Sequence, residues 1–203
     1  MPNHRQAWEK NWLMTHGWTA AQIETLIAND EQTPVEYLTG WAQFLDLQVQ
    51  VTKDTLIPRL ETEKLVALAV DEIAKNKVAN VWEVGTGSGA IAIALASELQ
   101  KKHLATQIFA SDISAAALQV ASKNLRRLQL EKVVTLAQAD LLDAEPKFFN
   151  QDGPWFLVAN LPYLPEFRRQ QMSVSVKNFE PEIALFAGAD GLVLIKKLLN
   201  SVI

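Results

Sequence analysis

EVGTGSGA, residues 83–90, is the stretch of this sequence that decides the fold. It follows the apolar pair Val81 and Trp82 and precedes an alanine-rich segment, so it predicts a turn from a strand into a helix. Its glycines let the backbone turn sharply and let a ligand approach the main chain above the helix N-terminus. The same letters fit the G-x-G-x-x-A pattern of dinucleotide-binding proteins, and a glycine-rich turn without a ligand is the plain alternative.

Around this loop, short apolar segments alternate with amphipathic ones. This alternation is typical of βαβ units, in which helices cover both faces of a parallel sheet. We therefore predict an α/β fold with right-handed crossovers. The expected strands are Val81–Val84, Gln107–Ser111, Val133–Ala137 and Trp155–Ala159, the last after an irregular stretch, and the expected helices are Ala90–Leu99 and Ala115–Leu128.

The chain before residue 80 predicts a different organisation. Short helices are expected over residues 5–29, where Thr19 is a candidate N-cap and Gln22 completes a capping box. Apolar residues recur with period two over residues 41–51, which favours a β-hairpin. A longer helix is expected over residues 62–75.

The composition excludes several classes of protein. The 203 residues carry a net charge of −4, and no basic surface that would hold nucleic-acid phosphates is evident. There are no cysteines, which excludes disulfides and thiolate metal sites. No run of about 18 apolar residues is present to span a membrane. The start of the chain, Met1 to Lys10, is polar and lacks a signal core, so we expect a soluble cytoplasmic protein.

Two carboxylates follow the second and third predicted strands. Asp112 is placed to accept both hydroxyls of a ribose, as acidic residues do after a glycine loop. Its alternative role is to cap the next helix, with Ser114 as the rival cap. Asp140 can accept the exocyclic amine of an adenine while Leu141 lies against the purine face. The alternative for Asp140 is a solvated loop acid.

Asn160-Leu161-Pro162-Tyr163 follows the last apolar strand directly. Ligands in open α/β sheets bind beyond the carboxyl ends of the strands. Four features lie at such predicted ends: the glycine loop, Asp112, Asp140 with Leu141, and Asn160–Tyr163. A simple Asn-x-Pro turn is the alternative. It does not explain why an aromatic residue follows or why every strand end carries suitable groups.

At this point the sequence resembles a known family, the HemK-type release-factor glutamine methyltransferases. Asn160–Tyr163 resembles the Asn-Pro-Pro-Tyr signature of methyltransferases that act on planar amide or amine nitrogens, and residues 83–89 resemble their cofactor loop. The resemblance extends from Pro34 to the C-terminus. Further matches are Pro34–Gly40 with Phe44 after it, Ile57–Glu63, and Phe179–Pro181 followed by Ala184, Leu185 and Gly191.

The resemblance implies a Rossmann-like S-adenosylmethionine-dependent methyltransferase fold with a small N-terminal helical part and a connecting β-hairpin. The implied domains are a substrate-recognition part at residues 1–40, a hairpin linker at 41–57 and a methyltransferase domain at 58–203. The implied acceptor is the N5 amide of a glutamine in a protein, in the Gly-Gly-Gln motif of peptide chain release factors. Neither direct nucleic-acid binding nor a membrane is implied.

The resemblance also implies roles for individual residues, and no metal. The methionine part of S-adenosylmethionine is assigned to the loop, the ribose to Asp112, and the adenine to Asp140 and Leu141. Asn160 touches both cofactor and substrate. The implied cofactor residues are Gly85, Thr86, Gly87, Ser88, Gly89, Asp112, Asp140, Leu141 and Asn160, and the implied catalytic residues are Asn160, Leu161, Pro162 and Tyr163.

The sequence departs from the family pattern in three ways. Leu161 replaces the first proline, the N-terminal helical part is short, and Ile203 falls before the family's last three strands. If those strands are absent, residues 155–159 form a sheet edge that invites self-association. The alternatives are an rRNA adenine-N6 methyltransferase, whose motif Asn160–Tyr163 also resembles, a truncated non-catalytic cofactor-binding chain, and an NAD-dependent enzyme.

Overall fold

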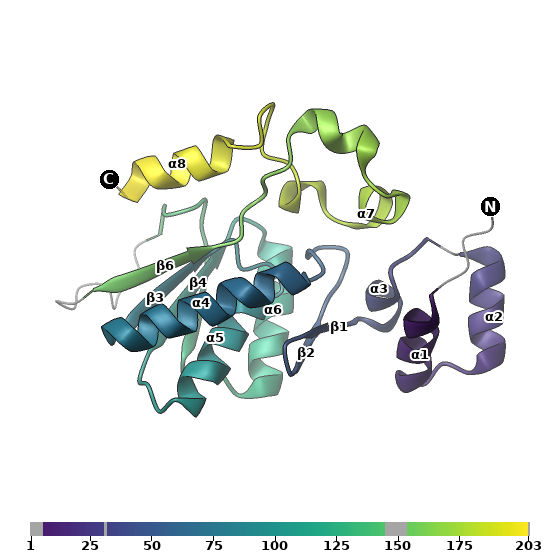
Figure 1. Ribbon diagram of the computed structural model, residues 1–203, viewed down its shortest axis with the longest axis horizontal. Coiled ribbons are helices and arrows are strands. Elements are labelled where there is room, and N and C mark those ends of the chain that lie inside the picture. Colours follow the sequence, from purple (N-terminus) through teal and green to yellow (C-terminus); the bar gives the residue numbers. More distant parts are fainter. Residues whose placement is uncertain (1–5, 31, 145–153, 203) are drawn as a thin grey trace.

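The computed structural model describes residues 6–30, 32–144 and 154–202, which form an α/β fold around a parallel sheet (Figure 1). The sheet has the order β5-β4-β3-β6. This order confirms the predicted Rossmann-like class. The strands are β3 (Asn80–Val84), β4 (Gln107–Asp112), β5 (Val134–Gln138) and β6 (Trp155–Ala159).

The register of the sheet brings the predicted site residues to one edge. Val84 ends β3 and pairs with Ser111 of β4 and with Ala159 of β6. Gly85 of the glycine loop, Asp112 and Asn160 each come one residue later, so they lie at the same level of the carboxyl edge. Parallel strands share a carboxyl edge, and this edge is where ligands bind in open α/β sheets.

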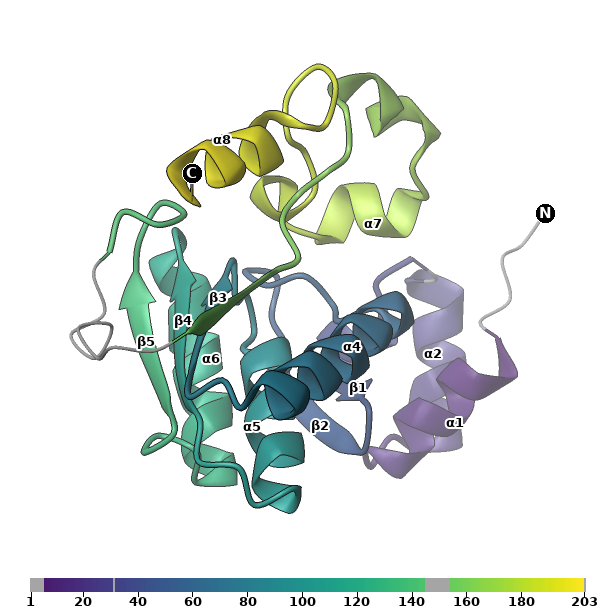
Figure 2. The same cartoon turned by 60° about the vertical axis from the view of Figure 1, so that its left-hand side comes forward.

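The two faces of the sheet are covered by different helices. On one face the main core includes residues of α4 (Leu60–Asn76) and α5 (Ala90–Lys101), with Leu125 from α6 (Ala115–Leu128). Side chains of a strand alternate between faces, so Val81 joins this core while Trp82 and Val84 face the other way. There they pack with Leu198 of α8 (Val193–Val202), which Figure 2 shows above the sheet.

The predicted N-terminal helices are present in the described residues, as α1 (Ala7–Thr15) and α2 (Ala20–Asn29). Thr19 caps α2 and Gln22 completes the capping box, as predicted. With α3 (Val35–Thr39), the two helices build a small core of their own around Leu13, Ile23 and Val35. They lie beside the sheet region (Figure 1), and residue 5, the first of the predicted helical range 5–29, falls outside the described residues.

The predicted hairpin consists of β1 (Trp41–Phe44) and β2 (Leu47–Gln50). It packs against α6 through Asn124, whose side chain is fully buried. Asn124 accepts a hydrogen bond from the Gln50 N–H (2.7 Å) and donates to the Gln50 and Ser88 carbonyls (2.9 Å each). One buried amide therefore joins the hairpin to the glycine loop.

Several element bounds differ from the predictions. Helix α4 begins at Leu60, two residues before the predicted start. Strand β5 runs one residue later than predicted, from Val134 to Gln138. Strand β6 has one strand neighbour in the described part of the chain, and of its residues only Val158 is buried. The irregular stretch predicted before β6 includes residues 145–153, which lie outside the described residues.

After β6 the chain makes a helical excursion and returns. Leu164 forms a parallel bridge with Phe186, through hydrogen bonds to the Leu185 carbonyl and from the Ala187 N–H (3.0 Å each). This bridge closes the base of the excursion beside the carboxyl edge of the sheet. The excursion contains η1 (Glu166–Gln171), α7 (Val174–Phe179) and η2 (Glu182–Ala184).

Candidate functional site

The glycine loop takes a backbone path that ordinary side chains resist. Gly85, Gly87 and Gly89 all have positive φ angles, of 76°, 57° and 83°. The N–H groups of Gly85 and Thr86 donate to the carbonyl of Ser111 (2.8 and 2.9 Å), which fixes the loop to β4. The loop then enters α5 with Gly89 at its N-cap. The predicted strand–turn–helix is therefore confirmed.

Glu83 supports the glycine loop through Thr86, and no role was predicted for it from the sequence. Its side chain is fully buried, and its Oε2 accepts a hydrogen bond from the Thr86 hydroxyl (2.7 Å). Its Oε1 has no hydrogen-bond partner among the described residues. Burial raises the pKa of Glu83 to about 7, because a buried carboxylate loses its hydration. A carboxylate inside an otherwise apolar strand was the signal that could have identified it.

Asp112 is turned toward the glycine loop. Its Oδ2 accepts a hydrogen bond from the Gly87 N–H (2.7 Å), and its Oδ1 accepts one from the Ser114 N–H (2.9 Å). Ser114 is the cap of α6, since its hydroxyl accepts a hydrogen bond from the Ala117 N–H. Asp112 is therefore not the helix cap and lines the pocket beside the loop.

Asp140 and Leu141 lie on the far side of the same pocket. Leu141 is buried and has a positive φ of 55°, an uncommon backbone for a branched side chain. The carboxylate of Asp140 forms an ion pair with Lys197 of α8 (2.5 Å). This contact competes with the adenine contact expected for Asp140, and both side chains are partly exposed, so either can move.

Most of the predicted cofactor residues line one cavity, here called the cofactor pocket. Gly89 is the exception: it does not line the cavity, and a Cβ there would lie 3.2 Å from Cβ of Ala121 in α6. Its role is close packing of the loop. The predicted residues that line the cofactor pocket are Gly85, Thr86, Gly87, Ser88, Asp112, Asp140, Leu141, Asn160, Leu161 and Pro162.

Asn160 stands between the cofactor pocket and a second cavity. Its side-chain Nδ2 donates to the hydroxyl of Thr62 in the first turn of α4 (3.2 Å). Leu161 is buried, and its Cδ2 lies 3.1 Å from the position that a Cβ on Gly85 would occupy. The segment after β6 is thereby packed directly against the glycine loop.

The second cavity, here called the acceptor pocket, encloses about 440 Å³. This volume is within the range of small-molecule sites. Asn160, Leu161 and Thr62 line both cavities, while Tyr163 lines only this one and is 61% exposed. The rest of its wall is mostly apolar and includes Leu56, Leu65, Leu164, Met172, Val176 and Leu185.

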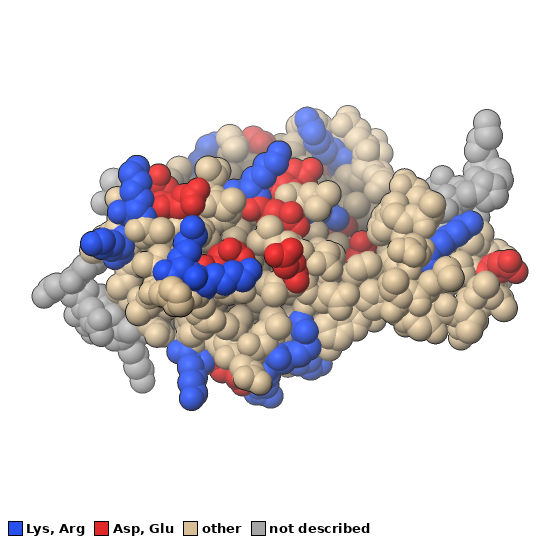
Figure 3. All heavy atoms as spheres, turned by 60° about the horizontal axis from the view of Figure 1, so that its bottom comes forward, with Lys and Arg blue, Asp and Glu red and all other residues tan. Residues whose placement is uncertain are grey.

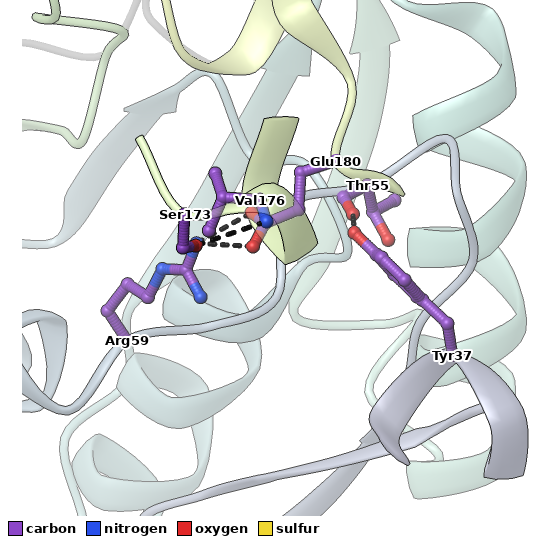
Figure 4. Close-up of polar contacts among 6 residues, drawn as sticks. All are labelled: Tyr37, Thr55, Arg59, Ser173, Val176 and Glu180. Atoms are coloured by element: carbon purple, nitrogen blue, oxygen red, sulfur yellow. Dashed lines mark hydrogen bonds and ion pairs between the residues drawn. The ribbon is translucent and has the colours of Figure 1, made fainter. Parts of the chain in front are cut away.

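A buried ion pair holds one wall of the acceptor pocket in place (Figure 4). Arg59 Nη2 lies 2.6 Å from both carboxylate oxygens of Glu180, whose side chain is 1% exposed. Burial raises the pKa of Glu180, and the Arg59 charge opposes that rise. Nearby, the Tyr37 hydroxyl donates to the carbonyl of Thr55 (2.7 Å). Figure 4 therefore shows residues from three motifs that are remote in sequence: Tyr37 from residues 34–40, Arg59 from residues 57–63 and Glu180 from residues 179–181.

The face of the molecule in Figure 3 shows no dominant charge. On the face in Figure 3, basic side chains are interspersed with acidic ones. Among the described residues, no group of three or more His, Asp or Glu side chains is arranged to hold a metal ion. In the same part of the chain, no helix is long and apolar enough to cross a bilayer.

Comparisons with known proteins agree on a methyltransferase. A family model described as a methyltransferase domain matches residues 75–154. The release factor glutamine methyltransferase of Rhodopirellula baltica is 40% identical over 177 residues, which cover 84% of this chain and 56% of that protein. The protein of the same name from Xylella fastidiosa is 35% identical over 207 residues, covering 94% of this chain and 68% of its own.

The relatives are longer than this chain, which spans 56% to 60% of those from Rhodopirellula baltica and Lactococcus lactis. Among solved structures, the hMettl16 catalytic domain in complex with a MAT2A 3′UTR hairpin has a TM-score of 0.56. It is 15% identical, and the match covers 75% of this chain and 55% of that one. At this identity the likeness concerns the fold alone.

Proposed function

We propose that this chain, which belongs to the release factor glutamine methyltransferase family, transfers a methyl group from S-adenosylmethionine to the side-chain amide nitrogen of a glutamine in a protein. The proposed acceptor is the Gly-Gly-Gln motif of a peptide chain release factor, and the proposed compartment is the cytoplasm. The observation that carries the proposal is the position of Asn160, between a pocket suited to the cofactor and a pocket open to a side chain.

The residues of the cofactor pocket fit S-adenosylmethionine chemically. The glycine loop keeps side chains away from the main chain, where the methionine part would lie. Asp112 offers carboxylate oxygens to the ribose hydroxyls, and buried Leu141 offers an apolar face to the adenine. Asp140 would accept the adenine amine after releasing Lys197. When bound, the cofactor supplies a methyl group activated by its sulfonium.

Asn160 and Leu161 would orient the glutamine amide, whose low nucleophilicity is the main obstacle to the reaction. An amide nitrogen is a poor nucleophile because its lone pair is delocalised, so the nitrogen must be held in line with the methyl group. Asn160 Oδ1 would accept one amide N–H, and the Leu161 carbonyl would accept the other. Both acceptors also stabilise the positive charge that grows on the nitrogen as the C–N bond forms and the C–S bond breaks. The methylated nitrogen would then lose one N–H proton to solvent water, which leaves a neutral N-methyl amide.

Leu161 does not remove this chemistry, because any residue at that position keeps its carbonyl. Pro162 restricts Leu161 to an extended backbone, as the family proline would be restricted. Tyr163, exposed at the mouth of the acceptor pocket, would pack on the incoming glutamine segment. The side chain of Leu161 packs against the glycine loop at Gly85.

The test compares two acceptors. The chain is incubated with methyl-labelled S-adenosylmethionine and either purified release factor or naked ribosomal RNA, and the products are analysed by mass spectrometry. We expect one labelled methyl group on the glutamine of the Gly-Gly-Gln peptide and none on the RNA. Label on adenine in the RNA would instead support the adenine-N6 alternative. Cofactor binding without transfer to either acceptor would support a non-catalytic chain.

A further inference from the structure

We propose that Thr62 is a positioning residue that holds the Asn160 side-chain amide in place, with its nitrogen on Thr62 and its oxygen left for the acceptor. This inference rests on the proposed function and extends it to a residue outside the Asn160–Tyr163 motif. Its basis is the hydrogen bond from Asn160 Nδ2 to Thr62 Oγ1 (3.2 Å), between residues 98 positions apart. Thr62 is 9% exposed and lines both pockets.

The orientation of this amide decides whether the site works. An asparagine side chain presents an oxygen that accepts hydrogen bonds and an NH₂ that only donates them. The glutamine nitrogen of the substrate also carries N–H donors, so it needs the oxygen. An Asn160 amide turned by half a rotation would place NH₂ against NH₂. The two ends are almost equal in size, so packing alone distinguishes them poorly.

Thr62 has the properties needed to hold the Asn160 side chain in place. It lies in the first turn of α4, where its N–H is bonded to the Arg59 carbonyl (3.0 Å). Its β-branched side chain is restricted about χ1 and is buried between the two pockets. A hydroxyl can accept or donate, and here it accepts from Nδ2, while no hydrogen bond to Oδ1 comes from the described residues.

The position of Thr62 is itself held by the acceptor side. Arg59, at the N-cap of α4, is anchored by Glu180 from the excursion after β6. The Ile57–Glu63 and Phe179–Pro181 segments therefore act together on Asn160, although neither contributes a reacting group. Positioning of Asn160 is therefore a physical role for both segments, to which the proposed mechanism assigns no contact with the reacting atoms or the glycine loop.

The first experiment separates positioning of the Asn160 side chain from binding of the release factor and of S-adenosylmethionine. Thr62→Val keeps the shape and removes the acceptor for Nδ2, whereas Thr62→Ser keeps the hydroxyl. We expect Thr62→Val to lower kcat for release-factor methylation about tenfold, which is the scale of one lost hydrogen bond. The KM for release factor and the Kd for S-adenosylmethionine should change less than about twofold, and Thr62→Ser should restore kcat.

A matched control addresses general damage to the fold. Thr106→Val removes another buried threonine hydroxyl, one that is bonded to the Val78 carbonyl away from both pockets. It should leave kcat unchanged. The proposal is overturned if Thr62→Val keeps full kcat, if Thr62→Ser is as impaired as Thr62→Val, or if cofactor affinity falls in parallel with kcat.

A second measurement does not depend on activity. The side-chain amide resonance of Asn160 is assigned in an ¹⁵N-labelled sample by its loss in Asn160→Ala. We expect Thr62→Val, but not Thr62→Ser, to shift this resonance and speed its hydrogen exchange. If wild-type protein methylates no glutamine yet the resonance responds this way, the proposed function fails and the positioning contact stands. An unchanged resonance in Thr62→Val overturns the positioning role whatever the activity.

Discussion

The cofactor pocket and the acceptor pocket lie side by side, but they are built in different ways. The cofactor pocket depends on nearby residues: Thr86 is bonded to Glu83, three positions away, and Gly87 to Asp112, 25 positions away. The acceptor pocket depends on Asn160–Thr62 and Arg59–Glu180, which join residues 98 and 121 positions apart. The loop and the carboxylate Asp112 of the first pocket come from consecutive βα units, whereas the two polar contacts of the second pocket both join distant segments.

This difference predicts how each pocket fails. Changes in the acceptor pocket should remove catalysis while the cofactor still binds, because binding depends on the local loop. Changes in the cofactor pocket should act through the loop backbone and its buried carboxylate. Asn160 lines both cavities, so a change there can be tested for loss of catalysis and for loss of cofactor binding separately.

The largest effect is expected from Asn160→Ala. It removes the acceptor that stabilises charge in the transition state, so kcat for release-factor methylation should fall at least about 100-fold. The Kd for S-adenosylmethionine, measured by titration calorimetry, should change less than about threefold, because this contact matters most in the transition state. A parallel loss of cofactor affinity would show that the two pockets are not separable here.

Glu83 should make the protein less stable as pH rises. Its pKa in the folded protein, about 7, is above the ordinary glutamate value of 4.5, so the folded state holds its proton more tightly than the unfolded state. The stability contributed below pH 4.5 is therefore lost as pH rises through 7, by about 3 kcal/mol. Urea unfolding at pH 5 and pH 8 measures the change, which should shrink in Glu83→Gln. If the unfolding free energy changes equally between pH 5 and pH 8 in wild type and in Glu83→Gln, groups other than Glu83 cause the change.

Arg59→Ala should destabilise the acceptor side. It leaves the buried carboxylate of Glu180 without its partner, and we expect a loss of about 2 kcal/mol, reduced from the full penalty because Arg59 is 36% exposed. Lys101→Ala breaks an exposed pair with Glu98 and serves as the control, with a much smaller change in unfolding free energy. Equal losses in the two variants would mean that the Arg59 pair is no stronger than a surface contact.

The smallest effect tests the contact between the pockets. Gly85→Ala and Gly87→Ala both put a side chain at a positive φ, which should cost each about 1 kcal/mol. Only at Gly85 would the new Cβ meet a neighbour, Leu161 Cδ2 at 3.1 Å. Urea unfolding should therefore show the larger loss for Gly85→Ala. The reverse order would mean that Leu161 moves aside without cost.

Much of the fold was predictable because it depends on local sequence patterns. The apolar strands, the capping box at Thr19 and the glycine loop each follow from residues within a few positions of one another. Parallel strands share a carboxyl edge, so Asp112 and Asn160 could be placed together before any coordinates. Element bounds were less predictable: β5 begins at Val134, one residue into the apolar run that predicted it.

The rest was not predictable, because it depends on pairs of distant side chains. No local pattern shows that buried Asn124 joins the hairpin to the glycine loop, or that Lys197 reaches Asp140. The same holds for Thr62 and Asn160. Motif resemblance indicated that residues 57–63 and 179–181 matter, but not that they act on one amide.

The most direct test of the account is a crystal structure of this chain with S-adenosylhomocysteine, the demethylated form of the cofactor. We expect its ribose hydroxyls on the Asp112 carboxylate, its methionine part along the glycine loop, and its sulfur facing Asn160 and the acceptor pocket. An adenosyl group bound in the acceptor pocket, or a complex in which Asp112 and Asn160 both lack contact with the ligand, would contradict the division into two pockets.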